Sequence, residues 1–221
     1  MPQLQVESFA QSAGNSASHS LSYLRESKFN VCDVGAGDGK YAIRLARSLT
    51  SAVVVAIDAE GTRMHKSAQR LKGKAPGNLI FWIGSLDAGI PSAKEMFDEI
   101  HVILPWGSLL EGMLGLDMPV LSNVLDLGRP NARLIVVLNQ RPWRIGQIDR
   151  RTENLPSPSD VEVEGQIRSF LSDRGWSVRY WSPMEESEAR GIESSWSRRI
   201  AASQPPEFLR YEAVHQDDLA G

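Results

Sequence analysis

Three acidic residues each follow an apolar stretch in the first half of the chain. Asp33 opens a glycine-rich run, Asp58 ends a run of β-branched residues, and Asp87 follows a third apolar segment. A carboxylate at Asp58 can accept hydrogen bonds from both hydroxyls of a ribose, and one at Asp87 can meet an adenine amino group. Glycines between such residues allow a tight turn and leave room for a ligand. The pattern therefore predicts a nucleoside site.

The run Asp33-Val34-Gly35-Ala36-Gly37-Asp38-Gly39 leaves three interpretations open. A dinucleotide site requires Gly-x-Gly-x-x-Gly, and here the third glycine comes one residue early. Asp33 and Asp38 would also repel a pyrophosphate, whereas they suit a ligand with a cationic amino-acid end, such as S-adenosylmethionine (SAM). The third interpretation is a tight turn without a ligand, in which Asp58 and Asp87 are ordinary loop acids or helix caps.

Two tryptophans have surroundings that favour presentation to a ligand. Trp106 stands between Pro105 and Gly107, which would fix its loop, and Trp196 lies in the connection before the last apolar segment. Two aromatic rings on opposite rims could hold a base that has been pulled from its stack. The alternative for each is packing in the core, which is also the default interpretation of the remaining tryptophans, Trp82, Trp143, Trp176 and Trp181.

The spacing of apolar residues predicts alternating strands and helices. The strands are expected at 29–34, 52–58, 79–83, 100–104, 133–139, 176–181 and 208–215. Helices are expected at 40–49, 62–72, 109–116 and 120–127, the last two interrupted at Pro119, and again from Val163 to Leu171. Residues 140–158 are expected to form an irregular loop. Regular alternation of this kind predicts a doubly wound, mainly parallel seven-stranded α/β sheet.

Composition narrows the class of protein. The chain has 221 residues, 42% of them hydrophobic and 23% charged, with 24 Lys and Arg against 27 Asp and Glu. The resulting net charge of −3 excludes indiscriminate coating by nucleic acid but allows a local basic patch. One cysteine, Cys32, excludes an internal disulfide, and neither a signal peptide nor a membrane span is visible. These features predict a cytoplasmic protein.

Residues 1–28 are expected to be a flexible N-terminal extension, because 8–20 are rich in Ser and Ala and offer few large apolar groups. A lightly tethered helix near Ser20–Ser27 is the alternative. Residues 29–221 are expected to form one domain with inserts at about 140–158 and 183–204.

The chain resembles a known family, the aminoglycoside-resistance methyltransferases of the kanamycin–apramycin type, which modify N1 of adenine 1408 in 16S ribosomal RNA. The resemblance covers roughly residues 30–200 and rests on Asp33–Gly39, Asp58, His101–Leu110, Arg129–Asn139 and Ser194-x-Trp196-x-Arg198-Arg199-Ile200. The runs around Trp106 and Trp196 are highly specific. The resemblance implies a Rossmann-like class I SAM-dependent methyltransferase that acts on the 30S subunit and confers aminoglycoside resistance.

The resemblance also implies roles for single residues. Trp106 and Trp196 would sandwich the flipped adenine, Ser194 would close over the cofactor, and Arg199 would contact the RNA. Together with the glycine-rich turn, the expected SAM-binding residues are Asp33, Gly35, Gly37, Tyr41, Asp58, Leu86, Asp87, Leu104, Pro105, Ser108 and Ser194. The chain departs from the family pattern at two places. Family members usually begin with a β-hairpin, whereas this chain begins with the Ser- and Ala-rich extension, and they usually carry Arg or Lys where this chain has Gln204–Glu207.

RNA docking requires positive charge near the site. The candidate residues are Arg63, Lys66, Arg70, Arg150, Arg151, Arg198 and Arg199. The alternative for these residues is that they only keep the protein surface solvated and do not bind RNA. The expected partner is the 30S subunit. The protein is expected to be a monomer and to have no membrane partner.

The expected chemistry needs neither a general base nor a metal. Adenine N1 carries an in-plane lone pair, and the four histidines are scattered without the spacing of a metal site. Two other functions remain open at this point. One is a SAM-dependent methyltransferase of a small natural product, and the other is a SAM- or RNA-binding homologue without turnover.

Overall fold

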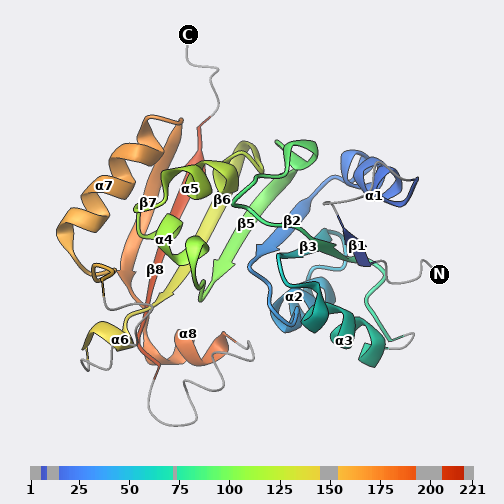
Figure 1. Ribbon diagram of the computed structural model, residues 1–221, viewed down its shortest axis with the longest axis horizontal. Helices are drawn as coiled ribbons and strands as arrows, with labels where there is room; N and C mark the ends of the chain where they lie inside the picture. Colours follow the sequence, from blue (N-terminus) through green and yellow to red (C-terminus); the bar gives the residue numbers. More distant parts are fainter. Residues whose placement is uncertain (1–5, 9–14, 72–73, 145–153, 193–205, 217–221) are drawn as a thin grey trace.

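The computed structural model describes residues 6–8, 15–71, 74–144, 154–192 and 206–216. They form one eight-stranded sheet in the order β1-β4-β3-β2-β5-β6-β8-β7 (Figure 1). Pairing is parallel from β1 to β6, while β8 runs antiparallel to both β6 and β7. No helix in the described part of the chain is long and apolar enough to span a membrane.

All seven predicted strands are present, and β1 adds an eighth beside β4. The strands are β1 Val6–Ser8, β2 Asn30–Val34, β3 Val53–Asp58, β4 Leu79–Ile83, β5 Phe97–Ile103, β6 Gly128–Asn139, β7 Trp176–Pro183 and β8 Phe208–His215. The α-helices are α1 Asn15–Glu26, α2 Lys40–Ser48, α3 Gly61–Leu71, α4 Ser108–Met113, α5 Met118–Leu125, α6 Arg141–Arg144, α7 Val161–Ser172 and α8 Glu186–Gly191. One 3₁₀ turn, η1, spans Pro91–Ala93.

The sheet is covered on both faces, which explains why its central strands are continuously apolar. Along β3, Val55 and Ile57 belong to a core shared with α4, α5 and α7, whereas Val54 and Ala56 pack with α2 and α3. In Figure 1 the first group of helices lies over the left half of the sheet, and α2 and α3 lie at the right. This arrangement brings the carboxyl ends of β2 to β6 to one edge.

The helix expected at 109–116 ends early, and the predicted interruption at Pro119 is wrong. Pro119 lies in the first turn of α5, where proline is favoured because no backbone N–H is needed there. The Asp117 side chain caps this helix by accepting from the backbone N–H of Val120 at 3.1 Å. The break comes instead before Asp117, where Gly115 adopts a φ of 77°.

Within the expected extension 1–28, residues 15–26 match the alternative that the sequence left open, a tethered helix. Residues 15–26 form α1, and Leu24 is completely buried in the main core. The Asn30 side-chain amide donates to the carbonyls of Leu24 and Met96, both at 2.8 Å. Leu24, with Leu21 packed beside it against the same core, and a backbone tie thus anchor a helix that is otherwise rich in Ser.

The last strand completes the left half of the sheet. Tyr211 on β8 is fully buried, stacks on Trp181 of β7 with ring centres 4.6 Å apart, and donates its hydroxyl to the carbonyl of Met113 at 3.1 Å. Trp82 and Trp176 are buried in the core, as their default interpretation predicted. Trp143 and Trp181 are partly buried against it.

Candidate active site

A cavity of about 310 Å³ lies at the carboxyl edge of β2 to β5, and we call it the central cavity. Its volume is at the lower end of the range of small-molecule sites, roughly 300–1,000 Å³. Its walls come from the turn after β2, the end of β3, the loop after β4 and the loop after β5. The predicted site residues among them are Gly35, Gly37, Asp58, Leu86, Asp87, Leu104, Pro105, Trp106, Ser108 and Arg63.

The glycine turn after β2 is shaped by left-handed backbone. Gly35 has a φ of 74° and Gly37 a φ of 59°, conformations that favour glycine. The backbone N–H groups of Gly35 and Ala36 both donate to the carbonyl of Ile57, at 2.8 and 3.0 Å, which ties the turn to β3. A Cβ on Gly35 would come within 2.6 Å of the Leu109 side chain. Positions 35 and 37 therefore favour glycine by backbone conformation, and at position 35 a side chain would also displace Leu109.

Asp58 is already oriented by the backbone around it. Its Oδ2 accepts from the N–H of Gly37 at 2.8 Å, and its Oδ1 accepts from the N–H of Glu60 at 2.7 Å. Each carboxylate oxygen has two lone pairs, so both retain capacity for a ligand hydroxyl. The side chain is half-buried and lines the central cavity, which is where the sequence predicted a ribose-binding acid.

The loop after β4 is held by a residue that the sequence analysis missed. The Asn123 side-chain amide, on α5, donates to the carbonyl of Leu86 at 2.7 Å. Asp87 is exposed, and the Ser85 hydroxyl donates to its Oδ2 at 3.0 Å. No local sequence signal marks Asn123, because its partner is 37 residues away along the chain.

Two predicted cofactor residues, Asp33 and Tyr41, are not among the described residues that line the central cavity. Asp33 is 2% exposed, and its Oδ2 makes no hydrogen bond in the described structure. Burial, with the nearby Asp58 carboxylate, raises the pKa of Asp33 to about 7.

Tyr41 faces a chain of polar groups on the α2 side of the sheet. Its hydroxyl and Nδ1 of His101 are 2.9 Å apart, and Nε2 of His101 lies 3.2 Å from Glu99. Burial raises the pKa of Tyr41 well above its ordinary value. The hydrogen bond to His101 lowers the pKa of Glu99.

Trp106 stands on the loop after β5 with 36% of its surface exposed, at the wall of the central cavity. Residues on both sides of Trp106 have a positive φ. Leu104 has a φ of 54°, which is uncommon for a residue with a side chain, and Gly107 has a φ of 59°. The N–H of Leu104 donates to the carbonyl of Val137 at 2.8 Å and so ties the strained position to β6. The loop presents the indole instead of burying it.

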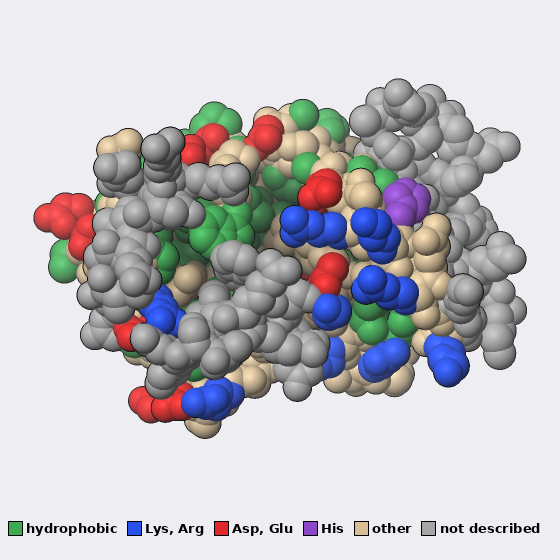
Figure 2. All heavy atoms as spheres, turned by 60° about the horizontal axis from the view of Figure 1, so that its bottom comes forward, with side chains coloured by type: hydrophobic (Ala, Val, Ile, Leu, Met, Phe, Trp, Pro, Cys, Tyr) green, Lys and Arg blue, Asp and Glu red, His purple; other side chains and the backbone are tan. Residues whose placement is uncertain are grey.

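The second half of the predicted site lies outside the described residues. This applies to Ser194, Trp196, Arg198 and Arg199, and also to Arg150 and Arg151. Arg63, Lys66 and Arg70 are exposed on α3. Figure 2 shows Lys and Arg side chains gathered on the right of that view, over the region of α2 and α3. Among the described residues, no three His, Cys, Asp or Glu side chains are grouped to hold a metal ion.

Comparison with known proteins decides the family. The model of the 16S rRNA (adenine(1408)-N(1))-methyltransferases, named for NpmA, matches residues 13–215. The chain belongs to this family. An enzyme of that name from Streptoalloteichus tenebrarius is 34% identical over 180 residues, 78% of this chain and 80% of the relative. Another, from Escherichia coli, is 25% identical over 183 residues, 80% of this chain and 83% of the relative.

Solved structures of the family share the fold. The 16S rRNA methyltransferase KamB is 30% identical and superposes with a TM-score of 0.77, covering 94% of this chain and 96% of its own. A variant of the Catenulisporales acidiphilia enzyme, solved with its cosubstrate SAM, has a TM-score of 0.83 at 24% identity and covers 95% of each chain. The family membership, the Rossmann-like fold and the expectation of a SAM-dependent methyltransferase are thus confirmed.

Proposed function

We propose that this protein transfers the methyl group of SAM to N1 of adenine 1408 in 16S ribosomal RNA and thereby confers aminoglycoside resistance. The observation that carries the proposal is the exposed Trp106 on the wall of the central cavity, in a chain that belongs to the adenine-1408 methyltransferase family. The expected partner is the 30S subunit, which the protein would bind as a monomer in the cytoplasm.

The residues of the central cavity fit SAM. Asp58 offers oriented acceptors to the ribose, and Leu86 and Asp87 lie in the loop where the adenine would be held. Glycines at 35 and 37 leave the floor open beside them. Asp33 lies behind the turn and, with a pKa of about 7, is partly ionised at neutral pH, where its negative charge would suit the ammonium group of SAM. Leu104, Pro105 and Ser108 close the remaining wall.

The chemistry asks the protein chiefly for positioning. SAM supplies an electrophilic methyl group on a sulfonium leaving group. Adenine N1 uses an in-plane lone pair, so no side chain has to remove a proton first. We assign Trp106, together with Trp196, to holding the extruded adenine in line with the methyl group. Orientation of two reactants in this way can contribute about 7–11 kcal/mol to lowering the barrier.

The test is a methylation assay with three substrates: purified 30S subunits, free 16S RNA and a panel of small metabolites. We expect transfer to 30S subunits and a reverse-transcription stop at adenine 1408. Methyl transfer to a metabolite but not to 30S would support a small-molecule enzyme. SAM binding without any transfer would support a homologue without turnover.

A further inference from the structure

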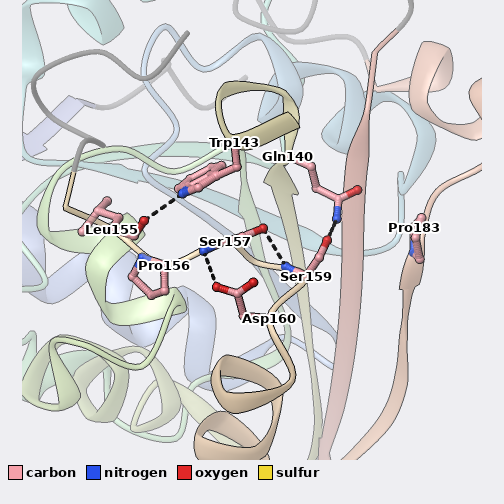
Figure 3. Close-up of a pocket in the computed structure, with 8 residues that line it drawn as sticks. All are labelled: Gln140, Trp143, Leu155, Pro156, Ser157, Ser159, Asp160 and Pro183. Atoms are coloured by element: carbon pink, nitrogen blue, oxygen red, sulfur yellow. Dashed lines mark hydrogen bonds between the residues drawn. The ribbon is translucent and has the colours of Figure 1, made fainter. Parts of the chain in front are cut away.

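A second and larger hollow lies beside the central cavity, and we call it the Trp143 pocket. Its volume is about 600 Å³, and Figure 3 shows the residues that line it: Gln140, Trp143, Leu155, Pro156, Ser157, Ser159, Asp160 and Pro183. They come from the end of β6, from α6, from the segment that leads into α7, and from the end of β7. The proposed methyl transfer uses none of them.

The two hollows are neighbours. A small recess of about 10 Å³ is lined by Trp106 and Trp143 together, with Pro105, Asn139 and Pro142. Trp106 also lines the central cavity, and Trp143 also lines the Trp143 pocket. The three hollows therefore follow one another along the carboxyl edge of the sheet, from the end of β3 to the end of β7.

The Trp143 pocket is a built site with fixed walls. The indole N–H of Trp143 donates to the carbonyl of Leu155 at 2.8 Å, which sets the ring across the loop (Figure 3). Gln140 is 3% exposed, and its side-chain amide donates to the Ser159 hydroxyl. The N–H of Ser157 donates to Oδ2 of Asp160 at 2.9 Å. These ties hold the polar groups in place before any ligand arrives.

The chemistry of these walls suits the edge of a base and not a phosphate. The described lining residues include no Lys or Arg, and they include one carboxylate, that of Asp160. Its Oδ1 makes no hydrogen bond among the described residues, so it can accept from an amino group. A flat aromatic wall with amide and hydroxyl groups beside it is how proteins recognise unstacked bases of RNA.

We infer that the Trp143 pocket receives a second RNA base, one that carries an exocyclic amino group and lies close to the target adenine. The base packs on Trp143 and donates its amino group to Asp160. This inference rests on the proposed function, since it requires an RNA substrate in the central site. The second base would give the protein an additional RNA contact beside the adenine that is methylated.

Filling the pocket tests the inference. Ser159 is exposed at its rim, so Ser159→Trp fills the space, but it also removes the hydroxyl that accepts from Gln140. Ser159→Ala, which removes the same hydroxyl without filling the pocket, separates the two effects. Ser169→Trp, on the exposed face of α7, is the matched control. Asp160→Asn keeps an acceptor for the N–H of Ser157 but removes the charge, and Asp173→Asn at the other end of α7 is its control. Melting temperature, SAM affinity, and kcat and KM on 30S subunits are measured for all five variants.

We expect Ser159→Trp to lower kcat/KM on 30S subunits by about 5- to 150-fold, the range that stacking of one base corresponds to. SAM affinity should stay unchanged, and the melting temperature of Ser159→Trp should match that of Ser159→Ala, which lacks the same hydroxyl but should keep the parent kcat/KM. Both α7 controls should match the parent protein. Chemical probing of the 30S complex should show one protected base besides the target, and Ser159→Trp should abolish that protection.

Equal kcat/KM and equal protection in a folded Ser159→Trp variant would overturn the inference while leaving the proposed function intact. So would a loss of SAM affinity in Ser159→Trp and Asp160→Asn alike, because the pocket would then serve the cofactor site. A parent protein that does not methylate 30S subunits would overturn the proposed function and this inference together.

Discussion

The backbone N–H of Gly37 donates to Oδ2 of Asp58 over 2.8 Å. This bond joins the turn after β2 to the end of β3, so one carboxylate both shapes the glycine turn and faces the central cavity. A site built in this way is set before the ligand binds, since the acceptor and the turn beside it hold each other in place.

Asp58→Ala should weaken SAM binding by about 10- to 150-fold, corresponding to the loss of roughly 1.5–3 kcal/mol for hydrogen bonds to a charged group. Asp58→Asn should lose less, because the amide oxygen can still accept from Gly37. Calorimetry measures both affinities. Unchanged SAM affinity in Asp58→Ala would remove Asp58 from the cofactor site.

Trp106→Ala should slow methylation of 30S subunits by about 5- to 150-fold while the melting temperature and SAM affinity hold, because the indole is exposed and would stack on a base. Trp106→Phe should recover part of the rate through its remaining π-face. The control is Trp176→Ala, which removes a buried indole and should cost about 3–5 kcal/mol of stability. A parallel fall in stability and rate in Trp106→Ala would mean that Trp106 is a packing residue.

Charge reversal on α3 should weaken association with 30S subunits without altering SAM affinity. In the double variant Lys66→Glu/Arg70→Glu, the slope of log affinity against log salt should become less steep by about 0.7–0.9 for each phosphate that the protein ceases to neutralise. Arg63 is left in place because it lines the central cavity. The matched double variant Arg168→Glu/Arg174→Glu, on and beside α7, should keep the parent slope. Identical slopes for both variants would place the RNA elsewhere.

Stability should depend on pH through Asp33. Its pKa is about 7 in the folded protein against an ordinary 3.8, so between these values the folded state holds a proton that the unfolded chain has lost. The free energy of unfolding should therefore fall as pH rises from about 4 to 7, by at most about 1.4 kcal/mol per pH unit from this group. Asp33→Asn removes the effect, so the parent should lose stability relative to this variant over that range.

Urea unfolding at pH 5, 6, 7 and 8 measures the difference between the parent and Asp33→Asn. Val31→Ala, a buried change on the same strand without a titrating group, should give an offset from the parent that is independent of pH. A pH-independent difference for Asp33→Asn as well would contradict the assignment.

The parts of the site that could be predicted are those encoded in a few consecutive residues. The glycine turn, Asp58 at a strand end and Trp106 between proline and glycine all fall where the local pattern placed them. Asn123 was missed because its bond to Leu86 depends on how α5 packs over the loop after β4. Leu24 anchors α1 through a core contact that the Ser- and Ala-rich composition conceals.

Asp33 shows a second reason why the sequence does not predict the whole site. Its position before the glycine turn indicated a cavity-lining acid, yet alternation along β2 turns its side chain into the α2 side of the sheet. Strand periodicity fixes the face of a side chain, but the depth of burial depends on the helix packed over it.

The position of β8 governs the order in which the sheet can form during synthesis. The strands from β2 to β5 find parallel partners among segments that leave the ribosome before residue 104. In the described sheet β7 pairs only with β8, which comes later in the chain and lies between β7 and β6. Vectorial folding can therefore assemble the half that carries the glycine turn first, while β7 has to wait for Phe208–His215.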